Sequence, residues 1–377
     1  MSDDREATYA RLPADLLAQL LNSAPRVAEQ VSALLTPALE QREALRQAAE
    51  RTGLIRQVEA AKHTTLCAAD GGFAVERTIA VDIVMAVAVG VEGFGEEGVT
   101  SPWTTNQYSS FHEVMLHDVD NERLARAAMM THELAILADA PHQIRIYDGS
   151  HLTPVIQLNS GYSSRSPLVH EGAVNIGLER GIVEALTSFA SNPQVISMPK
   201  YDSSTDIAKR LGHEIGLEIP GDDKYVTSLI LRGGEYTNPQ QVAGAQWAQL
   251  HLSAPDSSLG ETNGLLGELD HAIDPLRRCE LYFLYWRPDD AAPTYRLEIK
   301  PALAHDATAL AIVLSSLAHQ ITGPFVREPY PQYLADVMAK SVGLGLGALK
   351  AAALLSLTRT QPELAPMLVQ SYRTEGK

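Results

Sequence analysis

The stretch Thr64–Gly93, TTLCAADGGFAVERTIAVDIVMAVAVGVEG, organises the expected fold of this chain. Its first part is a short apolar run that starts at Leu66 and stops at Asp70, and Gly71–Gly72 lets the backbone turn tightly there. Its second part, Ile79–Val91, is almost wholly Val, Ile, Ala and Met. That composition is typical of a central strand buried on both faces, and the run is too short to span a membrane. The stretch predicts two buried strands that meet at Asp70, which is either a site residue or, more simply, the turn aspartate of a β-hairpin.

Length and composition favour one large α/β domain with helical additions. The chain has 377 residues and no linker rich in Pro, Gly and Ser, so we expect a main domain at residues 61–340 and helical segments at 1–60 and 341–377. A hydrophobic fraction of 45% is ordinary for a soluble protein, and no N-terminal segment has the apolar core of a signal peptide. We therefore expect a cytoplasmic protein with no membrane span.

The two cysteines, Cys67 and Cys279, lie in apolar, strand-like runs, which predicts buried thiols rather than a disulfide framework or a cysteine metal site. The net charge is −16, from 30 basic and 46 acidic residues. Because a phosphate backbone attracts basic surfaces, this balance disfavours broad binding to nucleic acid and confines any DNA contact to a local basic region. It is equally compatible with a divalent-metal site or a cationic protein partner.

Helical spacing marks both ends of the chain. In residues 1–60, leucines and valines recur at helical intervals, which predicts two or three amphipathic helices whose apolar faces meet either the core or a partner. Ser341–Thr358 contains LGLGALKAAALLSL, an apolar helix suited to packing or dimerisation. In the middle of the chain we expect a strand at Val226–Leu231, and paired strands at Cys279–Trp286 and Tyr295–Ile299 whose aromatic residues belong to the core.

Asn121–Ala140 is the clearest predicted helix, since Asp120 or Asn121 can cap it and a proline follows its end. Glu133 is surrounded in this sequence by methionine, leucine and isoleucine. Its carboxylate therefore lies either at the edge of the apolar stripe or in a site.

A second acidic residue follows a short strand further along the chain. Gln143–Tyr147 reads QIRIY and is followed by Asp148 and a glycine, which repeats the arrangement at Asp70. A third strand is expected at Tyr108–Leu116. The expected order is therefore a strand that ends at an aspartate, two more strands, a helix that carries Glu133, and a fourth strand that ends at an aspartate. That is the order of a ribonuclease H-like mixed sheet, in which the first and fourth strands are neighbours and the helix would bring its glutamate to the two aspartates.

Three carboxylates that meet need a counter-charge. Two of them ~4 Å apart repel by about 4 kcal/mol at an effective dielectric constant of ~20. A divalent cation with hard oxygen ligands, magnesium or manganese, removes this cost and can activate water for an in-line phosphodiester displacement.

The chain resembles the NurA nucleases, which process DNA ends with the HerA translocase. The resemblance runs from Thr64 to the C-terminal helices and is carried by six motifs: AADGGFAVERTIAVDIVMAVAV, HELAIL, IRIYDGSHL, VISMPKYDSS, YRLEIKP and PYPQYLADVMAK. The first and third are the strongest matches.

This resemblance implies a manganese-dependent nuclease, with magnesium as the alternative ion, in which Asp70, Glu133 and Asp148 match the acidic metal-binding positions. Lys200 matches a lysine that the family often places near the active centre, although a solvated loop lysine is an equal alternative. The resemblance further implies 5′–3′ exonuclease and single-strand endonuclease activity on DNA, a role in end resection and repair, and a homodimer that docks on a hexameric HerA ATPase.

The last motif departs from the family pattern. Tyr330, Pro331 and Leu334 match it, but Met338 stands where the family has a histidine or an acidic residue. Asp336 is a substitute only if the helix turns it toward the site, since a two-residue offset changes the direction of a side chain. Tyr330 is retained as a candidate catalytic residue.

Two other functions are compatible with the sequence. An actin-like phosphotransferase also has Asp-Gly turns after its first strands, but it needs an internal repeat of the fold that this sequence lacks. A non-catalytic adaptor of a DNA translocase would retain the fold alone. The acidic trio argues against the adaptor, whereas Met338 and the acidic composition leave it open.

Overall fold

The computed structural model describes residues 13–95, 102–104, 107–201, 203–242, 252, 262–278, 280–323 and 326–369. These form two compact units. The first comprises the described parts of Met1–Ile55 and Asp202–Arg232, and the second those of Arg56–Tyr201 and Gly233–Lys377. The domain boundaries expected at residues 60 and 340 stay a prediction, and Cys279 lies outside the described residues.

The first unit is helical in its described part. It contains α2 (Ala14–Asn22), α3 (Ala24–Glu40), α4 (Arg42–Arg51), α9 (Asp206–Ile215) and α10 (Asp223–Ile230). The predicted N-terminal helices are confirmed. The apolar faces of α2 and α3 are not buried in the described structure, because α2 buries no side chain and α3 buries only Ala38. Helix α4, by contrast, buries Leu45, Ala48 and Ala49.

The strand expected at Val226–Leu231 is wrong, since these residues belong mostly to α10. The Asp222 carboxylate caps this helix by accepting the Tyr225 N–H at 2.7 Å. Val226 and Ile230 are both buried, one helical turn apart. A short apolar run fits a buried helix as well as a strand, and here the capping aspartate decides between them.

The second unit is built on one mixed sheet. Among the described residues its order is β1-β7-β9-β10-β6-β5-β2-β3-β4, with β8 paired to β9. The strands are β1 (Ile55–Gln57), β2 (Leu66–Arg77), β3 (Asp82–Glu92), β4 (Tyr108–Met115), β5 (Ile144–Tyr147), β6 (Val195–Ser197), β7 (Glu235–Thr237), β8 (Gln240–Gln241), β9 (Tyr282–Arg287) and β10 (Tyr295–Ile299).

The strands on the two sides of β2 run in different directions relative to it. This strand is antiparallel to β3, which is antiparallel to β4, whereas β5 is parallel to β2 and β6 is parallel to β5. The predicted adjacency of the first and fourth strands is confirmed. β9 and β10 pair antiparallel, as expected from their sequences.

The tight turn expected at Gly71–Gly72 is wrong, because β2 passes straight through both glycines. The hairpin turn lies further on, where the Thr78 N–H donates to Val81 O at 3.0 Å. The glycines instead allow close packing. A Cβ on Gly71 would lie 2.5 Å from Met129 Cγ, and a Cβ on Gly72 would lie 2.2 Å from Ala339 O.

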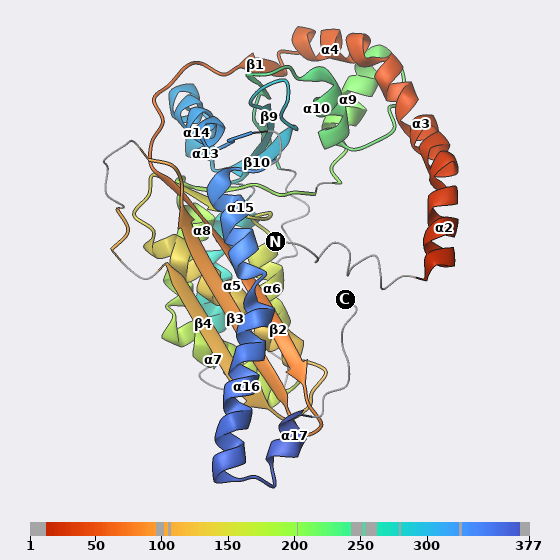
Figure 1. Ribbon diagram of the computed structural model, residues 1–377. Helices are drawn as coiled ribbons and strands as arrows, with labels where there is room; N and C mark the ends of the chain where they lie inside the picture. Colours follow the sequence, from red (N-terminus) through yellow and green to blue (C-terminus); the bar gives the residue numbers. More distant parts are fainter. Residues whose placement is uncertain are drawn as a thin grey trace. The chain divides into compact units, whose positions relative to one another are not determined.

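Successive strand residues point to opposite faces, so these two contacts show that helices cover both faces of β2. On one face α5 (Asn121–Asp139) packs against β2, β3 and β4, and is itself contacted by α6 (Thr153–Tyr162), α7 (Pro167–Glu179) and α8 (Ile182–Ser191). On the other, α15 (Tyr330–Ala339) and α16 (Val342–Thr360) run across β2 and β3 (Figure 1).

The remaining helices of this unit are α11 (Thr262–Ala272), α12 (Asp274–Arg277), α13 (Pro301–Ala304), α14 (Ala307–His319) and α17 (Ala365–Val369). A large apolar cluster fills the space between the sheet and α14, and includes Leu284, Trp286, Leu297 and Leu314. The prediction that the aromatic residues of β9 belong to the core is confirmed, as is the burial of Cys67.

One helical run among the described residues, Tyr330–Thr360, is long and apolar enough to cross a membrane by length and composition alone. Its first part is α15, which packs on β2 and carries the acidic residue Asp336 described below. We therefore assign this run to the fold.

Candidate metal centre

Three carboxylates from separate elements converge in the second unit. Asp70, Asp148 and Asp336 each offer an oxygen, and the three oxygens lie within 4.8 Å of one another. Asp70 lies on β2 and Asp148 directly follows β5. The parallel pairing of Ala69 with Tyr147 makes the two aspartates the next residues in register. Asp336 comes from α15 on the face of the sheet opposite α5.

Glu133 lies on α5 and points at the sheet. It is 2% exposed, so the interpretation of an edge residue is wrong. A Cβ on Gly71 would lie 3.1 Å from its Oε2, which places the carboxylate against the strand next to Asp70. Its Oε1 is buried and has no hydrogen-bond partner in the described structure. Glu133 is outside the trio whose oxygens meet within 4.8 Å, and it reaches β2 from the α5 face, whereas Asp336 comes from the α15 face.

Burial and mutual repulsion both favour the protonated forms of these acids. Burial, then the charge of Asp148, and more weakly that of Asp336, raise the pKa of Asp70 to about 7, although the Gly71 N–H at 2.8 Å from its Oδ1 acts in the opposite sense. Burial, followed by the charges of Asp70 and Asp148, raises the pKa of Glu133 well above its usual range. A bound cation would reverse both effects.

Asp148 is held from two sides. Gln332 Nε2 donates to its Oδ1 at 3.0 Å, and Lys200 Nζ lies 2.8 Å from its Oδ2. Lys200 follows β6, the parallel neighbour of β5, so the strand order delivers the lysine to the same edge as the aspartate. The alternative of a solvated loop lysine is wrong.

Lys200 also lies near two other acids. Its Nζ is 3.3 Å from Glu328 Oε2 and 3.5 Å from Asp336 Oδ1. Burial lowers the pKa of Lys200, but the hydrogen bond and charge of Asp148 and the charges of Glu328 and Asp336 outweigh it and raise the pKa above its usual value. The lysine is therefore an ammonium ion among carboxylates.

Tyr330 begins α15, and the structure does not bring its side chain to the acids by any contact among the described residues. Its ring stacks on Phe94, with centroids 4.5 Å apart and planes 24° apart. Its N–H donates to Gln320 O at 2.9 Å. The catalytic role of Tyr330 stays a prediction.

Gln332 and Glu328 were not among the site residues predicted from the sequence, and Asp336 was left open there. Gln332 and Asp336 are four residues apart on α15, so they share one helical face, and both reach the centre. Met338, by contrast, is 46% exposed. The signal was present in YPQYLADVMA, where two polar residues at this spacing interrupt an otherwise apolar helix.

The loop after Asp148 is fixed by a buried glutamate. Glu298 on β10 accepts Ser150 Oγ at 3.0 Å and the His151 N–H at 2.9 Å, both on its Oε2. Arg296 Nη2 donates to its Oε1 at 3.2 Å. Although burial acts against ionisation, the bonds from His151 and the charge of Arg296 lower the pKa of Glu298. An ionised, fully bonded Glu298 therefore anchors the chain two residues beyond Asp148.

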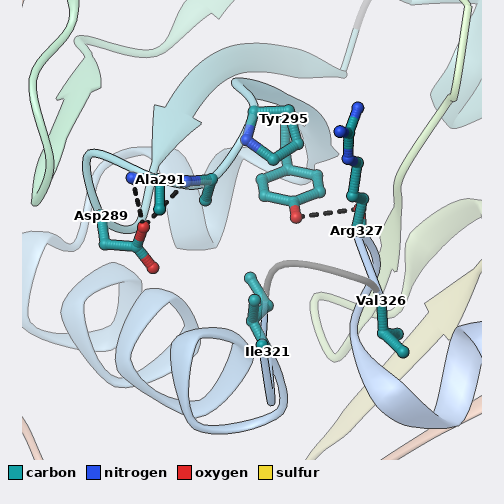
Figure 2. A pocket seen from close by; sticks show the side chains of 9 residues that line it. Asp289, Ala291, Tyr295, Ile321, Val326 and Arg327 are labelled. Carbon is teal, nitrogen blue, oxygen red and sulfur yellow. Dashed lines mark hydrogen bonds between the residues drawn. The ribbon is translucent and has the colours of Figure 1, made fainter.

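A cavity elsewhere in the unit, of about 250 Å³, lies between the end of β9 and the segment before α15 (Figure 2). Asp289 and Tyr295 in its lining are already hydrogen-bonded. The Asp289 carboxylate accepts the N–H groups of Ala291 and Ala292, and the Tyr295 hydroxyl donates to Arg327 O at 2.9 Å. It holds no group of acids, and we do not assign it a catalytic role.

The donor set fits a divalent cation. All the acids offer hard carboxylate oxygens, which Mg²⁺ and Mn²⁺ prefer, and no thiol takes part. The buried, unpartnered Oε1 of Glu133 supports the same conclusion, because a buried carboxylate oxygen without a hydrogen bond is costly unless something positive binds near it.

Comparison with known proteins points to one fold. No protein-family model and no curated protein matches the chain. Among solved structures, the NurA nuclease from Sulfolobus solfataricus is similar over 91% of this chain and 98% of its own, with a TM-score of 0.56 and 13% identity. A structure of NurA with manganese is similar over 89% and 98%, with a TM-score of 0.51 and 13% identity. The resemblance to NurA is thus confirmed for the fold.

Proposed function

We propose that this chain is a metal-dependent nuclease that hydrolyses phosphodiester bonds of DNA. The observation that carries the proposal is the convergence of Asp70, Asp148 and Asp336 within 4.8 Å of one another. The buried Glu133, whose Oε1 has no hydrogen-bond partner in the described structure, approaches the same strand from the α5 face. Carboxylates held together in this way, against their repulsion, are characteristic of sites that bind divalent ions. The similarity in fold to NurA nucleases gives independent support.

Each residue has a role that follows from its position. Asp70, Asp148 and Asp336 would hold the ion, and the ion would supply an activated water and neutralise charge on the scissile phosphate. Glu133 is kept as a proposed ligand because it matches an acidic position of the resemblance. Gln332 orients Asp148 through its hydrogen bond to Oδ1. Lys200 keeps a positive charge at the same edge of the sheet, where it would attract the phosphate.

The ribonuclease H-like classification is part of the proposal. It is supported by the order β4-β3-β2-β5-β6, in which β2, β3 and β4 are antiparallel and β5 and β6 continue parallel to β2. Helix α5, which enters after β4 and carries Glu133, covers one face of this part of the sheet.

Four further elements of the proposal rest on the similarity to NurA. They are manganese as the preferred ion, 5′–3′ exonuclease and single-strand endonuclease activity, a role in end resection and repair with a HerA-type hexameric ATPase, and assembly as a homodimer in the cytoplasm. Because the net charge of −16 repels DNA from most of the surface, we also propose that DNA reaches the centre through a local basic path. The adaptor alternative predicts binding to a translocase without cleavage.

Digestion of end-labelled DNA tests the proposal. The full chain is incubated with single- and double-stranded DNA in manganese, in magnesium and in EDTA, alongside the variant Glu133→Gln. We expect cleavage with a divalent ion, none in EDTA and none by the variant, since glutamine keeps the shape and a similar helix propensity but removes the charge. Cleavage in EDTA at the full rate would refute the metal-dependent mechanism, and inactivity of the wild-type chain in every metal would favour the adaptor.

A further inference from the structure

Lys200 brings an ammonium group into the cluster of carboxylates that we propose binds metal. Its Nζ is 2.8 Å from Asp148 Oδ2, 3.3 Å from Glu328 Oε2 and 3.5 Å from Asp336 Oδ1. Two of these partners, Asp148 and Asp336, belong to the trio whose oxygens lie within 4.8 Å of one another. The chain therefore supplies its own cation to acids that a metal ion would share.

The two cations oppose each other. A divalent ion bound to Asp148 and Asp336 would lie close to the ammonium of Lys200, and like charges at such a separation repel strongly in a partly buried site. The shortest of the three ion pairs joins Lys200 to Asp148, a residue whose side chain is only 9% exposed. A metal ion on the same carboxylate would compete with this pair.

Glu328 offers the ammonium another position. It belongs to the three partners of Lys200 but not to the aspartate trio. The side chains of Lys200 and Glu328 are 32% and 29% exposed, so this pair lies at the rim of the centre, where solvent and an anionic substrate can reach. The flexible four-carbon stem of a lysine allows such a shift without movement of the backbone.

We infer that Lys200 is a tethered counter-ion: it neutralises Asp148 and Asp336 before metal binds, and the arriving ion displaces its ammonium toward Glu328, where it contacts the phosphodiester. The inference rests on the proposed nuclease function and adds a competition between lysine and metal for the same carboxylates. This competition explains why Lys200 forms ion pairs with Asp148 and Asp336, the candidate metal ligands, instead of lying outside the cluster.

Lys340 provides a matched control. Its Nζ lies 2.6 Å from Asp336 Oδ2, but its side chain is 72% exposed and follows Asp336 by four residues on the helix surface. An exposed pair of this kind is screened by solvent, so removing Lys340 should change the centre little.

The test is calorimetric titration of the full chain with MnCl₂, without DNA, for wild type, Lys200→Gln, Lys200→Arg and Lys340→Gln. We expect Lys200→Gln to bind manganese roughly tenfold more tightly than wild type, because a competing charge is gone. Lys200→Arg keeps the charge and should stay close to wild type, as should Lys340→Gln. Thermal melts in EDTA establish that each variant is folded, and Lys200→Met replaces Lys200→Gln if the latter is not.

Manganese binding by Lys200→Gln that is unchanged or weaker than wild type overturns the inference. So does a manganese-bound crystal structure in which Lys200 Nζ still lies at hydrogen-bond distance from Asp148 Oδ2. The proposed function can fail separately. If the wild-type chain binds manganese, and Lys200→Gln binds it more tightly, but the wild-type chain cuts no DNA, then the competition between lysine and metal stands and the nuclease function is refuted. If the inference holds in full, Lys200→Gln also cleaves more slowly than wild type at saturating manganese despite its tighter binding.

Discussion

Gln332 Nε2 donates a 3.0 Å hydrogen bond to Asp148 Oδ1, and this bond ties α15 to the loop that follows β5. The two residues are 184 positions apart in the chain. Gln332 is 2% exposed, and its position on α15 also directs Asp336, one helical turn later, to the same centre. A helix from the C-terminal part of the chain thus supplies one acid and orients another.

The substitution Gln332→Met should weaken metal binding more than it destabilises the fold. Methionine removes the donor to Asp148, but it also removes Oε1, a buried oxygen without a hydrogen bond in the described structure. We expect the free energy of unfolding in EDTA to change by less than about 1 kcal/mol. The manganese Kd should rise by roughly tenfold, as for loss of an outer partner of a metal ligand. Urea unfolding and calorimetry measure the two quantities, and Gln47→Met, at an exposed site on α4, is the control.

In α15 the essential acid should be Asp336 rather than the residue at position 338. We expect Asp336→Asn to lose most manganese binding and at least about a hundredfold in cleavage rate, since one of three converging carboxylates is neutralised. Met338→Leu should cleave as wild type does, because Met338 is 46% exposed. Equal rates for wild type and Asp336→Asn would remove Asp336 from the centre and leave the fourth motif without a ligand.

The pKa of Asp70 predicts how stability depends on pH without metal. An aspartate usually titrates at 3.8, and burial with the charge of Asp148 raises the pKa of Asp70 to about 7 in the folded chain. Between these values the folded state binds more protons than the unfolded state. Asp70 therefore contributes fully to the stability of the fold at pH values below its unfolded pKa. That contribution is lost as the pH rises through its folded pKa.

In EDTA the melting temperature should fall as the pH rises from about 5 to about 8, and Asp70→Asn should flatten this slope. Manganese must displace the proton from Asp70, so its affinity for the wild-type chain should rise over the same range. A melting temperature in EDTA whose slope is the same in wild type and Asp70→Asn would contradict the raised pKa.

The sequence was sufficient for the elements around the centre. Apolar patterning predicted the strands and the helix with Glu133, and the ribonuclease H-like order of these elements implied that the strands before Asp70 and Asp148 are neighbours. The expected capping of this helix by Asp120 is not seen, since Asp120 makes no side-chain hydrogen bond to the first turn. Lys200 was expected near the centre only from the resemblance, and the structure supplies the reason, because a residue that follows a strand parallel to β5 reaches the same edge of the sheet.

Three features could not be predicted because they depend on tertiary contacts. Gly71 and Gly72 look like a turn, yet they are glycines because α5 and α15 approach the two faces of β2 closely. The helix α10 replaced a predicted strand, since a short apolar run carries no period of its own. Asp336 was left open because the sequence motif indicates position 338, and only the rotation of α15 on the sheet turns position 336 inward.

The substitution Gly72→Ala tests this packing and links it to the centre. Its Cβ would lie 2.2 Å from Ala339 O and 2.9 Å from Ala339 C, which are backbone atoms of α15 and cannot rotate away. The helix must shift, so we expect the free energy of unfolding to fall by about 1–3 kcal/mol, as for an overpacked core.

The same shift should reach the metal centre, since Asp336 lies three residues before Ala339 on this helix. We expect weaker manganese binding by Gly72→Ala even at temperatures where the chain remains folded. Gly343→Ala is the control, because a Cβ there meets nothing within 4 Å and alanine is the better helix former. It should match or exceed wild type in stability and leave manganese affinity unchanged. If Gly72→Ala lost stability but kept full manganese affinity, α15 could move without disturbing the acids, and the role assigned to Asp336 would be wrong.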